Sequence, residues 1–344
     1  MSKKYVMKFL FICVISEAAI FNGCTTMNSK AITYNPAIVD TDIHVDIYRP
    51  EKASNGTTLF ADNHNLDKPR IIEVNMRGEI VWEYVVPEHL KQYNNPGFDV
   101  EWLPNNNILF VLPRKGIYEI DRSGNVIWSY LDEKVSHDAD RLPNGNTLVV
   151  WGGGDGAGDA QVKEINPGGK IVWAWYAEKY FYKPPYNAIS DQGWTHTNAA
   201  TRLANGNTLI SPRNFHFLIE VDPRGRVVRT IGEGLMRYQH DPEVLLNGNI
   251  LFVNHSRPNT VIEIDPNGKI VWQYIMSDPN TWPVRDADRL PNGNTLITGT
   301  TKIVEVTPDG EVVWQLTLKG ITFEREKAAG LGFYKAERIK LHDK

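Results

Sequence analysis

The chain has 344 residues, of which 42% are hydrophobic and 23% charged, and its formal net charge is −4. This is ordinary globular composition with enough apolar material for a buried core, and the length fits one large all-β domain or two average domains. Because no basic block is present, the composition argues against nucleic acid as the main partner, and an anionic ligand would need a local positive pocket.

The N-terminal residues 1–30 resemble an export signal followed by a short lead. Lys3 and Lys4 precede an apolar run over residues 9–15, which is too short to span a membrane. Cys24 stands where a lipoprotein signal would place a lipidated cysteine, and simple cleavage nearby is the alternative. We therefore expect a periplasmic or exported protein, with membrane attachment only through a lipid on Cys24.

A short hairpin pattern recurs along the chain. Each copy has an apolar strand, a turn built on Asn-Gly or Asn-Asn, and a second apolar strand. An Asn-Gly pair between alternating apolar runs predicts a β-hairpin in which both turn residues have positive φ. The copies lie at residues 55–60, 103–109, 142–148, 203–209, 245–251 and 290–296.

A second hairpin follows each copy and usually closes on a tryptophan. These closing residues recur about every 45 positions and are Trp82, Trp128, Trp173, Arg229, Trp272 and Trp314. Four short strands per repeat are typical of a propeller blade. We therefore predict an all-β fold over residues 31–344, a six-bladed β-propeller of four-stranded antiparallel blades. Cys13 and Cys24 are the only cysteines, so this domain has no disulfide.

The C-terminal segment predicts how the ring closes. Tyr334–Ile339 aligns with Arg285–Leu290, the start of the last full repeat, but no Asn-Gly turn follows it. The first repeat lacks this strand, so we expect the C-terminal strand to become the innermost strand of blade 1 and remove the open edge. The alternative is that Val45–Tyr48 occupies that position.

The predicted hairpins bring basic side chains to one face of the disc. The turns lie on one face, so the starts of the innermost strands and the ends of the next strands open on the other, around the channel. At the starts stand Phe98, His137, Asn198, His240, Arg285 and Tyr334, with His196 two residues before Asn198 on the same side. At the ends stand His64, Arg213, His255 and Arg257. A rim rich in histidine and arginine suits a compact oxyanion such as sulfate or phosphate.

Structural interpretations compete with these functional ones. A lone histidine more often makes a structural hydrogen bond than it catalyses. Asp138, Asp241 and Asp286 recur at one repeat position, which favours a role in tying strands together. Three histidines suit zinc, but Arg213 beside them would oppose a cation, so we expect no metal and no cofactor.

Two loops stand out in the sequence. Gly152–Asp159 is not a phosphate-binding loop, because neither Lys-Ser/Thr nor a helix follows it, and we interpret it as a flexible connection. The aromatic-rich loop at 176–194, which ends at Trp194, leads into an innermost strand and is expected at the same rim. It would hold a planar ring or simply pack between blades.

Three motifs in order resemble the bacterial arylsulfate sulfotransferases of the exported, nucleotide-independent kind. They are Trp194-x-His196-x-Asn198, Ser211-Pro212-Arg213, and Gln239-His240-Asp241-Pro242 before a hairpin. The resemblance covers most of the chain after the signal and implies a six-bladed propeller with its active site at the channel mouth. The chain differs from that family in having only a short lead before the first blade, instead of a β-sandwich domain, and no paired loop cysteines.

The resemblance also implies roles for individual residues. His240 is similar to the nucleophile that becomes sulfated, His196 and Arg213 to the pair that contacts the sulfuryl group, and His137 to the remaining histidine. The implied reaction moves a sulfuryl group from a small aryl sulfate to a phenolic acceptor, with a protonated His196 stabilising the departing phenolate. Four further residues are candidates for substrate binding: Arg285, His255, Trp194 and Asn198.

Two other classes of function fit the same pattern. One is a non-catalytic propeller that binds a partner or a polysaccharide at the channel mouth. The other is a different propeller enzyme, such as a polysaccharide lyase that uses histidine and tyrosine, or a quinone-dependent dehydrogenase, because one fold supports many activities.

Overall fold

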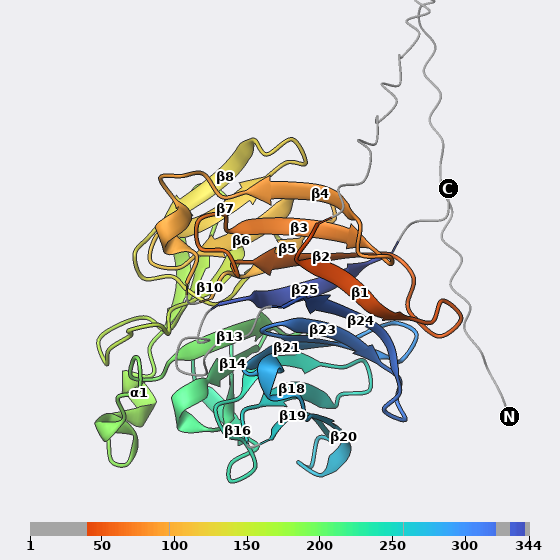
Figure 1. The fold of residues 1–344 in the computed structure, drawn as a ribbon. Helices are drawn as coiled ribbons and strands as arrows, with labels where there is room; N and C mark the ends of the chain where they lie inside the picture. Colours follow the sequence, from red (N-terminus) through yellow and green to blue (C-terminus); the bar gives the residue numbers. More distant parts are fainter. Residues whose placement is uncertain (1–39, 96, 257, 321–330, 341–344) are drawn as a thin grey trace, which may run out of the picture. The chain divides into compact units, whose positions relative to one another are not determined.

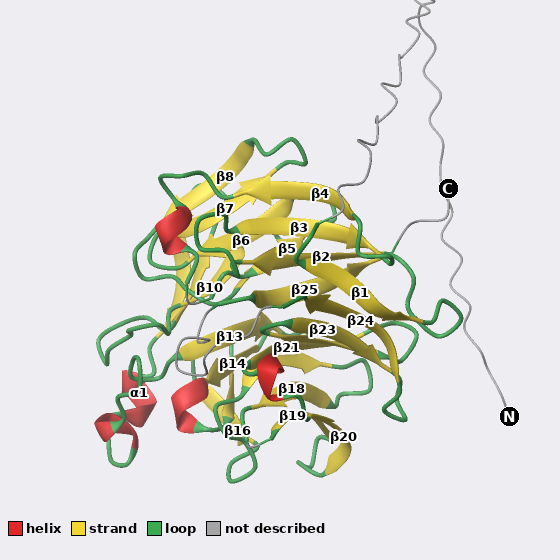
Figure 2. Cartoon of the chain, viewed as in Figure 1, coloured by secondary structure: helices red, strands yellow, loops and turns green. Residues whose placement is uncertain are grey.

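Six antiparallel sheets account for nearly all regular structure in the computed structural model (Figures 1 and 2), which describes residues 40–95, 97–256, 258–320 and 331–340. These residues belong to one unit, Pro36–Lys344. The expected export signal, Cys24 and Arg257 lie outside the described residues. Among those described, no helix has the length and apolar character that crossing a membrane requires. The sheets form the predicted six-bladed β-propeller.

The first three blades are given from the innermost to the outermost strand. Blade 1 consists of β25 (Phe333–Ile339), β2 (Thr57–Asp62), β3 (Arg70–Asn75) and β4 (Ile80–Val85). Blade 2 consists of β5 (Val100–Trp102), β6 (Ile108–Leu112), β7 (Gly116–Ile120) and β8 (Val126–Leu131). Blade 3 consists of β9 (Ala139–Arg141), β10 (Thr147–Val150), β11 (Val162–Ile165) and β12 (Ile171–Trp175).

The other three blades follow in the same order. Blade 4 consists of β13 (Thr197–Arg202), β14 (Thr208–Pro212), β15 (Leu218–Val221) and β16 (Val227–Ile231). Blade 5 consists of β17 (His240–Val244), β18 (Ile250–Asn254), β19 (Asn259–Ile264) and β20 (Ile270–Met276). Blade 6 consists of β21 (Val284–Arg289), β22 (Thr295–Gly299), β23 (Lys302–Val306) and β24 (Val312–Leu318).

Short helical turns occupy the connections between strands. The structure has one short α-helix, α1 (Glu178–Phe181), within its described residues. Four single 3₁₀ turns accompany it: η1 (Lys91–Tyr93), η2 (Tyr186–Ala188), η3 (Arg213–Phe215) and η4 (Pro279–Thr281). The one that matters for the site is η3, which begins at Arg213.

The ring closes through the C-terminal strand, as predicted. β25 lies beside β2 in Figure 1, and the two pair antiparallel from Thr57 opposite Ile339 to Asp62 opposite Phe333. The alternative, that Val45–Tyr48 fills this place, is wrong. These residues belong to β1 (Ile43–Tyr48), which pairs with β24. Blade 6 therefore has a fifth, outer strand, and the prediction of four strands holds for the other five blades.

The turns between the first two strands differ from the sequence prediction. Gly145 has φ +84°, but Asn144 is not among the residues with positive φ. The Gly145 N–H donates to the Leu142 carbonyl, and the Leu142 N–H donates to the Asn146 carbonyl. This is a three-residue loop with a glycine bulge, so only the glycine needs the left-handed conformation. The expectation of positive φ at both turn residues is wrong.

The second asparagine, which is present in five of the six turns, has a packing role that the hairpin pattern alone did not reveal. The Asn146 amide donates to Glu164 on β11 at 2.6 Å. The same pairing recurs as Asn107–Glu119, Asn207–Glu220, Asn249–Glu263 and Asn294–Glu305. The Asn-Gly-Asn sequence therefore locks the turn to the third strand of its own blade.

Closing tryptophans join neighbouring blades. The Trp82 indole N–H donates to the Arg122 carbonyl of blade 2, and the Arg122 guanidinium lies over the indole ring at 4.6 Å from its centroid. Equivalent indole bonds from Trp128, Trp272 and Trp314 reach the next blade, and in blade 3 this bond comes from Trp175 instead of Trp173, the closing residue predicted from the sequence. Blade 4 has Arg229 instead, which pairs with Glu220 of its own blade at 2.6 Å.

Prediction for ring closure. Gly56 precedes β2, and a Cβ added there would lie 2.1 Å from the Ile339 carbonyl oxygen of β25. Gly56→Ala should therefore force the closing strands apart and lower the free energy of unfolding in urea by about 1–3 kcal/mol. Gly158→Ala is the matched control, because no atom of the described residues lies within 4 Å of its added Cβ. That control should change stability by less than about 0.5 kcal/mol, and equal effects of both changes would contradict this account of closure.

Candidate active site

Aspartates on the innermost strands fix the residues that precede them. Each carboxylate accepts a hydrogen bond from a backbone N–H group of the next blade in the ring. The pairs are Asp99 with Ala139 of blade 3, Asp138 with Ala200 of blade 4, and Asp286 with Ala336 of blade 1. Each bond joins one inner strand to the next, so the structural interpretation of these recurring aspartates is confirmed for Asp138 and Asp286. The residue before each aspartate, such as His137, is thereby held at the start of its strand.

His137 and His196 contact each other across blades 3 and 4. Their Nε2 atoms lie 3.2 Å apart, and the two side chains are almost fully buried. His196 Nδ1 faces the Gln192 carbonyl at 3.0 Å, and His137 Nδ1 faces the Ser136 hydroxyl at 2.7 Å. A carbonyl only accepts, so His196 carries its proton on Nδ1 and accepts at Nε2. His137 then donates from Nε2 and accepts the Ser136 hydroxyl proton at Nδ1.

His240 and His255 form a second pair within blade 5. Their rings stack with centroids 4.2 Å apart. His240 Nδ1 lies 3.0 Å from the Tyr238 carbonyl, so this nitrogen carries the proton and Nε2 keeps a free lone pair. No hydrogen bond joins Nε2 of His240 to any residue that the structure describes. His255 bonds the Val284 carbonyl through Nε2.

Arg213 is the cation that acts on both pairs. Its guanidinium lies over the Tyr238 ring at 4.8 Å from the centroid, with only 14% of the side chain exposed. Among the described residues its nearest carboxylate is that of Asp191, which is 3.9 Å away and half exposed. The positive charge of Arg213 therefore remains largely available to an anion.

All four histidines are held neutral. Burial, followed by the charges of Arg213, Arg285 and Arg114, lowers the pKa of His137 to about 3. Burial also lowers the pKa of His255 to about 4, with Arg213 and Arg285 contributing. Burial, the neighbouring histidine and Arg213 lower the pKa of His196 and of His240 well below the usual value. None of the four is therefore an imidazolium at neutral pH.

Strained backbone concentrates around these residues. The structure has positive φ at His137 (+66°), His196 (+47°), Tyr238 (+48°) and Asp241 (+44°). Non-glycine residues in this region cost of order 1–3 kcal/mol each and gather at functional sites. The surrounding contacts must therefore hold these side chains in place against local preference.

Asp155 supplies much of that support for His196. Its carboxylate accepts the backbone N–H groups of Thr195 and His196 at 3.1 and 3.0 Å, and the Thr195 hydroxyl at 2.7 Å. Asp155 comes from the glycine-rich segment that the sequence favoured as a flexible connection. A Cβ on Gly152 would lie 2.1 Å from the Thr197 carbonyl oxygen, so the glycine permits this close approach. Sequence reasoning missed the role of this segment.

The remaining candidates support the rim in different ways. Arg285 is buried and donates from Nη1 to the Leu331 and Phe333 carbonyls at 2.9 and 2.7 Å, which anchors the start of β25. Burial lowers its pKa to about 10. The Asn198 amide donates to the Gln239 carbonyl at 2.8 Å, next to His240. Trp194 lies in the apolar core and donates to the Tyr186 carbonyl at 2.8 Å.

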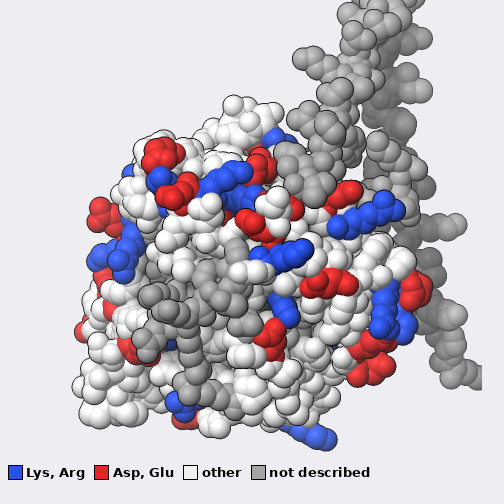
Figure 3. All heavy atoms as spheres, in the orientation of Figure 1, with Lys and Arg blue, Asp and Glu red and all other residues white. Residues whose placement is uncertain are grey.

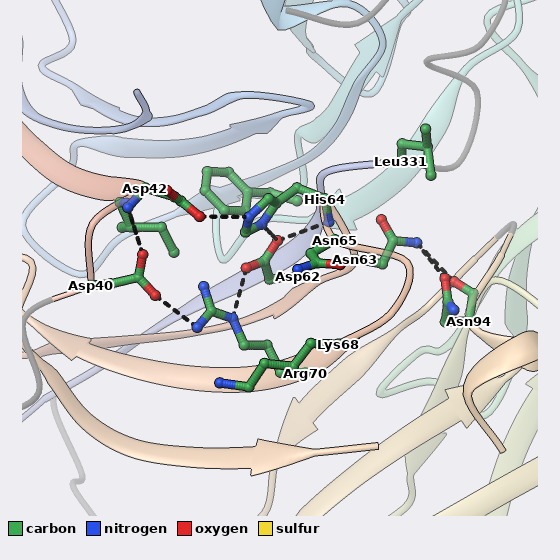
Figure 4. Close-up of polar contacts among 12 residues, drawn as sticks. Asp40, Asp42, Asp62, Asn63, His64, Asn65, Lys68, Arg70, Asn94 and Leu331 are labelled. Carbon is green, nitrogen blue, oxygen red and sulfur yellow. Dashed lines mark hydrogen bonds and ion pairs between the residues drawn. The ribbon is translucent and has the colours of Figure 1, made fainter. Parts of the chain in front are cut away.

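His64 belongs to a separate acidic cluster (Figure 4). Its ring lies 2.6 Å from Asp62 and 3.5 Å from Asp42, and Arg70 bridges Asp62 and Asp40. Burial opposes protonation, but Asp62 and Asp42 outweigh it and raise the pKa of His64. This contact stabilises the fold at pH below 6.5 and is lost as the pH rises through the raised value. His64 thus differs from the neutral rim histidines.

A cavity of about 640 Å³ opens beside the rim. Arg213, His255, Tyr238 and Trp282 line it together. Tyr238 also lines a second cavity of about 560 Å³ with Tyr186, Phe215 and Phe217. The aromatic residues Phe181, Tyr186 and Trp194 of the loop at 176–194 pack in the apolar core. These residues mainly pack, although Tyr186 also lines the second cavity. The aromatic residues that line the cavity beside the rim are Tyr238 and Trp282, which the sequence did not single out.

Prediction for pH. Between pH 6.5 and about 3 the unfolded chain binds a proton at His137 that the folded chain does not. The free energy of unfolding should therefore fall as the pH is lowered from 7 through this window. His137→Gln should make the dependence on pH shallower, whereas His89→Gln, at an exposed position, should leave it as in the wild type. An unchanged pH dependence in His137→Gln would contradict a buried neutral imidazole.

Comparison with known proteins identifies a family for this chain. The sequence profile of the family described as Arylsulfotransferase (ASST) matches residues 44–234, more than half of the chain. This match supports sulfotransferase activity in general and small-molecule substrates. No curated protein matches the chain.

Solved structures resemble the propeller at low sequence identity. A protein of unknown function from Bacteroides caccae is 21% identical with a TM-score of 0.55, covering 77% of this chain and 94% of that one. Virginiamycin B lyase from Staphylococcus aureus is 14% identical with a TM-score of 0.51, covering 83% and 87%. A streptogramin B lyase is 13% identical with a TM-score of 0.50, covering 83% and 90%. At these identities the likeness concerns the fold alone.

Proposed function

The chain belongs to the arylsulfotransferase family, and from this premise we propose that it transfers a sulfuryl group from an aryl sulfate to a phenol through a sulfated His240. One observation carries the proposal: the hydrogen bond from His240 Nδ1 to the Tyr238 carbonyl leaves Nε2 unprotonated beside Arg213. A neutral imidazole attacks without help from a strong base.

In the first step His240 Nε2 attacks sulfur and the bond from sulfur to the aryl oxygen breaks. The aryl oxide leaves with the bonding electrons, and an N–S bond joins the sulfuryl group to His240. In the second step the oxygen of a phenol attacks sulfur, the N–S bond breaks with its electrons returning to His240 Nε2, and the proton of the phenol passes to the His137–His196 pair, which replaces the proton given to the aryl oxide. His240 returns to its neutral form, so no cofactor is needed.

Arg213 stabilises the charge that this reaction concentrates on sulfuryl oxygens. Sulfuryl transfer is chemically analogous to phosphoryl transfer, in which a loose transition state leaves most of the catalytic work to positioned cations. The planar guanidinium offers a fork of donors to two oxygens. Stacking on Tyr238 holds its plane, and the distant Asp191 competes weakly for it.

The pair of His137 and His196 supplies the mobile proton. Both are neutral in the structure, so the sequence-based expectation of an imidazolium at His196 requires a bound anion, whose charge raises the pKa of a neighbouring histidine. The proton would then pass from this pair to the departing aryl oxide, for which the reference pKa of a phenol is about 10. The aryl ring would lie in the cavity beside Tyr238 and Trp282.

Export remains part of the proposal. In the proposed reaction the aryl sulfate is itself the sulfuryl donor, so no nucleotide-linked donor is required. The reaction therefore suits an enzyme outside the cytoplasm. The signal at 1–30 and Cys24 carry this expectation. Cell fractionation with Cys24→Ser would test it, because loss of the lipid would move the protein from the membrane to the soluble exported fraction.

Prediction for the intermediate. Mixing the protein with an aryl sulfate in the absence of a phenol should add the mass of one sulfuryl group, recorded on the intact protein without acid. His240→Ala should gain none and should lose aryl sulfate turnover by at least about 10³-fold. His89→Ala, at an exposed position, should behave as the wild type. A sulfuryl adduct retained in His240→Ala would refute His240 as the nucleophile.

Prediction for the cation. Arg213→Lys keeps the charge but loses the planar fork and the stacking on Tyr238. We expect kcat/KM for an aryl sulfate to fall by about 10²-fold, mainly through kcat, because the fork matters most in the transition state. Arg224→Lys, at an exposed turn, is the control and should leave kcat/KM unchanged. An effect confined to KM would argue for substrate binding alone.

A further inference from the structure

A separate cavity enters the propeller from the face that carries the Asn-Gly turns. It has a volume of about 810 Å³, and turn residues such as Asn205, Leu246 and Gly248 line its mouth. Its wall comes from the innermost strands of the blades. Six carboxylates and one lysine of these innermost strands line it: Glu101, Asp140, Asp241, Glu243, Asp288, Glu337 and Lys335.

The negative charge of this channel is only partly balanced. Lys335 Nζ lies 2.7 Å from Oδ1 of Asp138, 3.1 Å from Oδ1 of Asp241 and 3.3 Å from Oδ1 of Asp99. One ammonium group therefore pairs with carboxylates of blades 2, 3 and 5. Arg202 and Arg229 also line the cavity, but each pairs with a glutamate at 2.6 Å. The carboxylates of blade 6 have no comparable cation among the described residues.

Asp241, Asp286 and Asp288 form a compact cluster, in which Asp241 pairs with Lys335 and the two blade 6 carboxylates are the unbalanced ones. Asp286 and Asp288 project from the same side of β21, and Asp241 comes from the adjacent β17. Each offers a carboxylate oxygen, and the three oxygens lie within 4.8 Å of one another. Two oxygens on opposite sides of a Ca²⁺ ion, each at about 2.4 Å, are about 4.8 Å apart. The spacing therefore fits ligands of one ion.

An independent observation concerns the second oxygen of Asp286. Its Oδ2 accepts the Ala336 N–H at 3.0 Å and the Thr298 hydroxyl at 3.3 Å. Its Oδ1 is fully buried, only 2% of the residue is exposed, and no N–H or O–H donor of the described residues other than a carboxyl bonds to this oxygen. A buried carboxylate oxygen without a partner costs free energy, and a bound cation removes that cost.

We propose that Asp241, Asp286 and Asp288 bind a divalent cation with a preference for oxygen ligands, with Ca²⁺ as the best fit. Carboxylates are hard ligands, and Ca²⁺ completes its shell of 6–8 oxygens with water, which the open channel admits. The ion joins the innermost strands of blades 5 and 6. It lies on the channel side of β17, where Asp241 directly follows His240, so it stabilises the strand that carries the nucleophile without entering the rim.

The test uses the purified full-length protein after dialysis against EDTA. Titration calorimetry with CaCl₂ in excess KCl should show one Ca²⁺ bound per chain, and CaCl₂ should raise the temperature of thermal unfolding. Asp288→Asn should weaken Ca²⁺ binding and raise the dissociation constant by at least about tenfold. The Asp288 side chain has no hydrogen bond within the described part of the chain, so this change removes charge with little loss of structure.

Asp140→Asn is the matched control. Asp140 occupies the equivalent position of blade 3, lines the same cavity and also lacks a hydrogen bond to the described residues, but it is outside the cluster. It should leave the dissociation constant within about threefold of the wild type. Absence of Ca²⁺ binding to the wild-type protein at millimolar CaCl₂ would overturn the proposal. Equal weakening by both changes would also overturn it, because that result indicates diffuse negative potential rather than a site.

Discussion

The propeller depends on hydrogen bonds that run from a carboxylate of one innermost strand to the backbone N–H of the next. Asp99, Asp138 and Asp286 make such bonds at the rim side, and Glu101, Glu243 and Glu337 make them two residues later. The donor on the second strand is a backbone N–H group. Each bond therefore fixes the position of that strand independently of the side chains that the strand carries. The residue before each rim aspartate is thereby placed at the channel mouth.

This constraint explains how the rim holds buried imidazoles next to a guanidinium, although their close packing is electrostatically unfavourable. His137, His196, His240 and Arg213 come from three blades, and burial next to a guanidinium disfavours a positive charge on every imidazole. Several of the residues involved also have strained backbones. A rigid ring supplies the support, and neutral imidazoles beside one available cation are the arrangement that an incoming anion requires.

The sequence predicted the repeats, the six blades and the closing strand because hydrophobic alternation and turn residues are local signals. It also grouped His137, His196, Arg213 and His240 by their shared repeat positions. It did not predict the pairing of the histidines, their tautomers or the support from Asp155, since these depend on contacts between distant segments. Tyr238 escaped notice because its role rests on a backbone carbonyl and a ring face, which no sequence pattern marks.

Figure 3 shows acidic and basic side chains interspersed over the face in view, with no extended region of one sign. The charge that matters for the proposed reaction is that of the buried guanidinium of Arg213. This agrees with the composition, which contains no basic block and left an anionic ligand dependent on a local positive pocket.

The central claim is that side chains from separate blades form one anion-binding site around His240 Nε2. A crystal structure with a bound aryl phosphate, which resembles the sulfate ester but resists transfer, tests this most directly. The account predicts the anion within hydrogen-bond distance of Arg213, with its central atom facing His240 Nε2 and its ring against Tyr238 or Trp282. An anion bound elsewhere, or a rim in which these side chains contact no ligand, would contradict it.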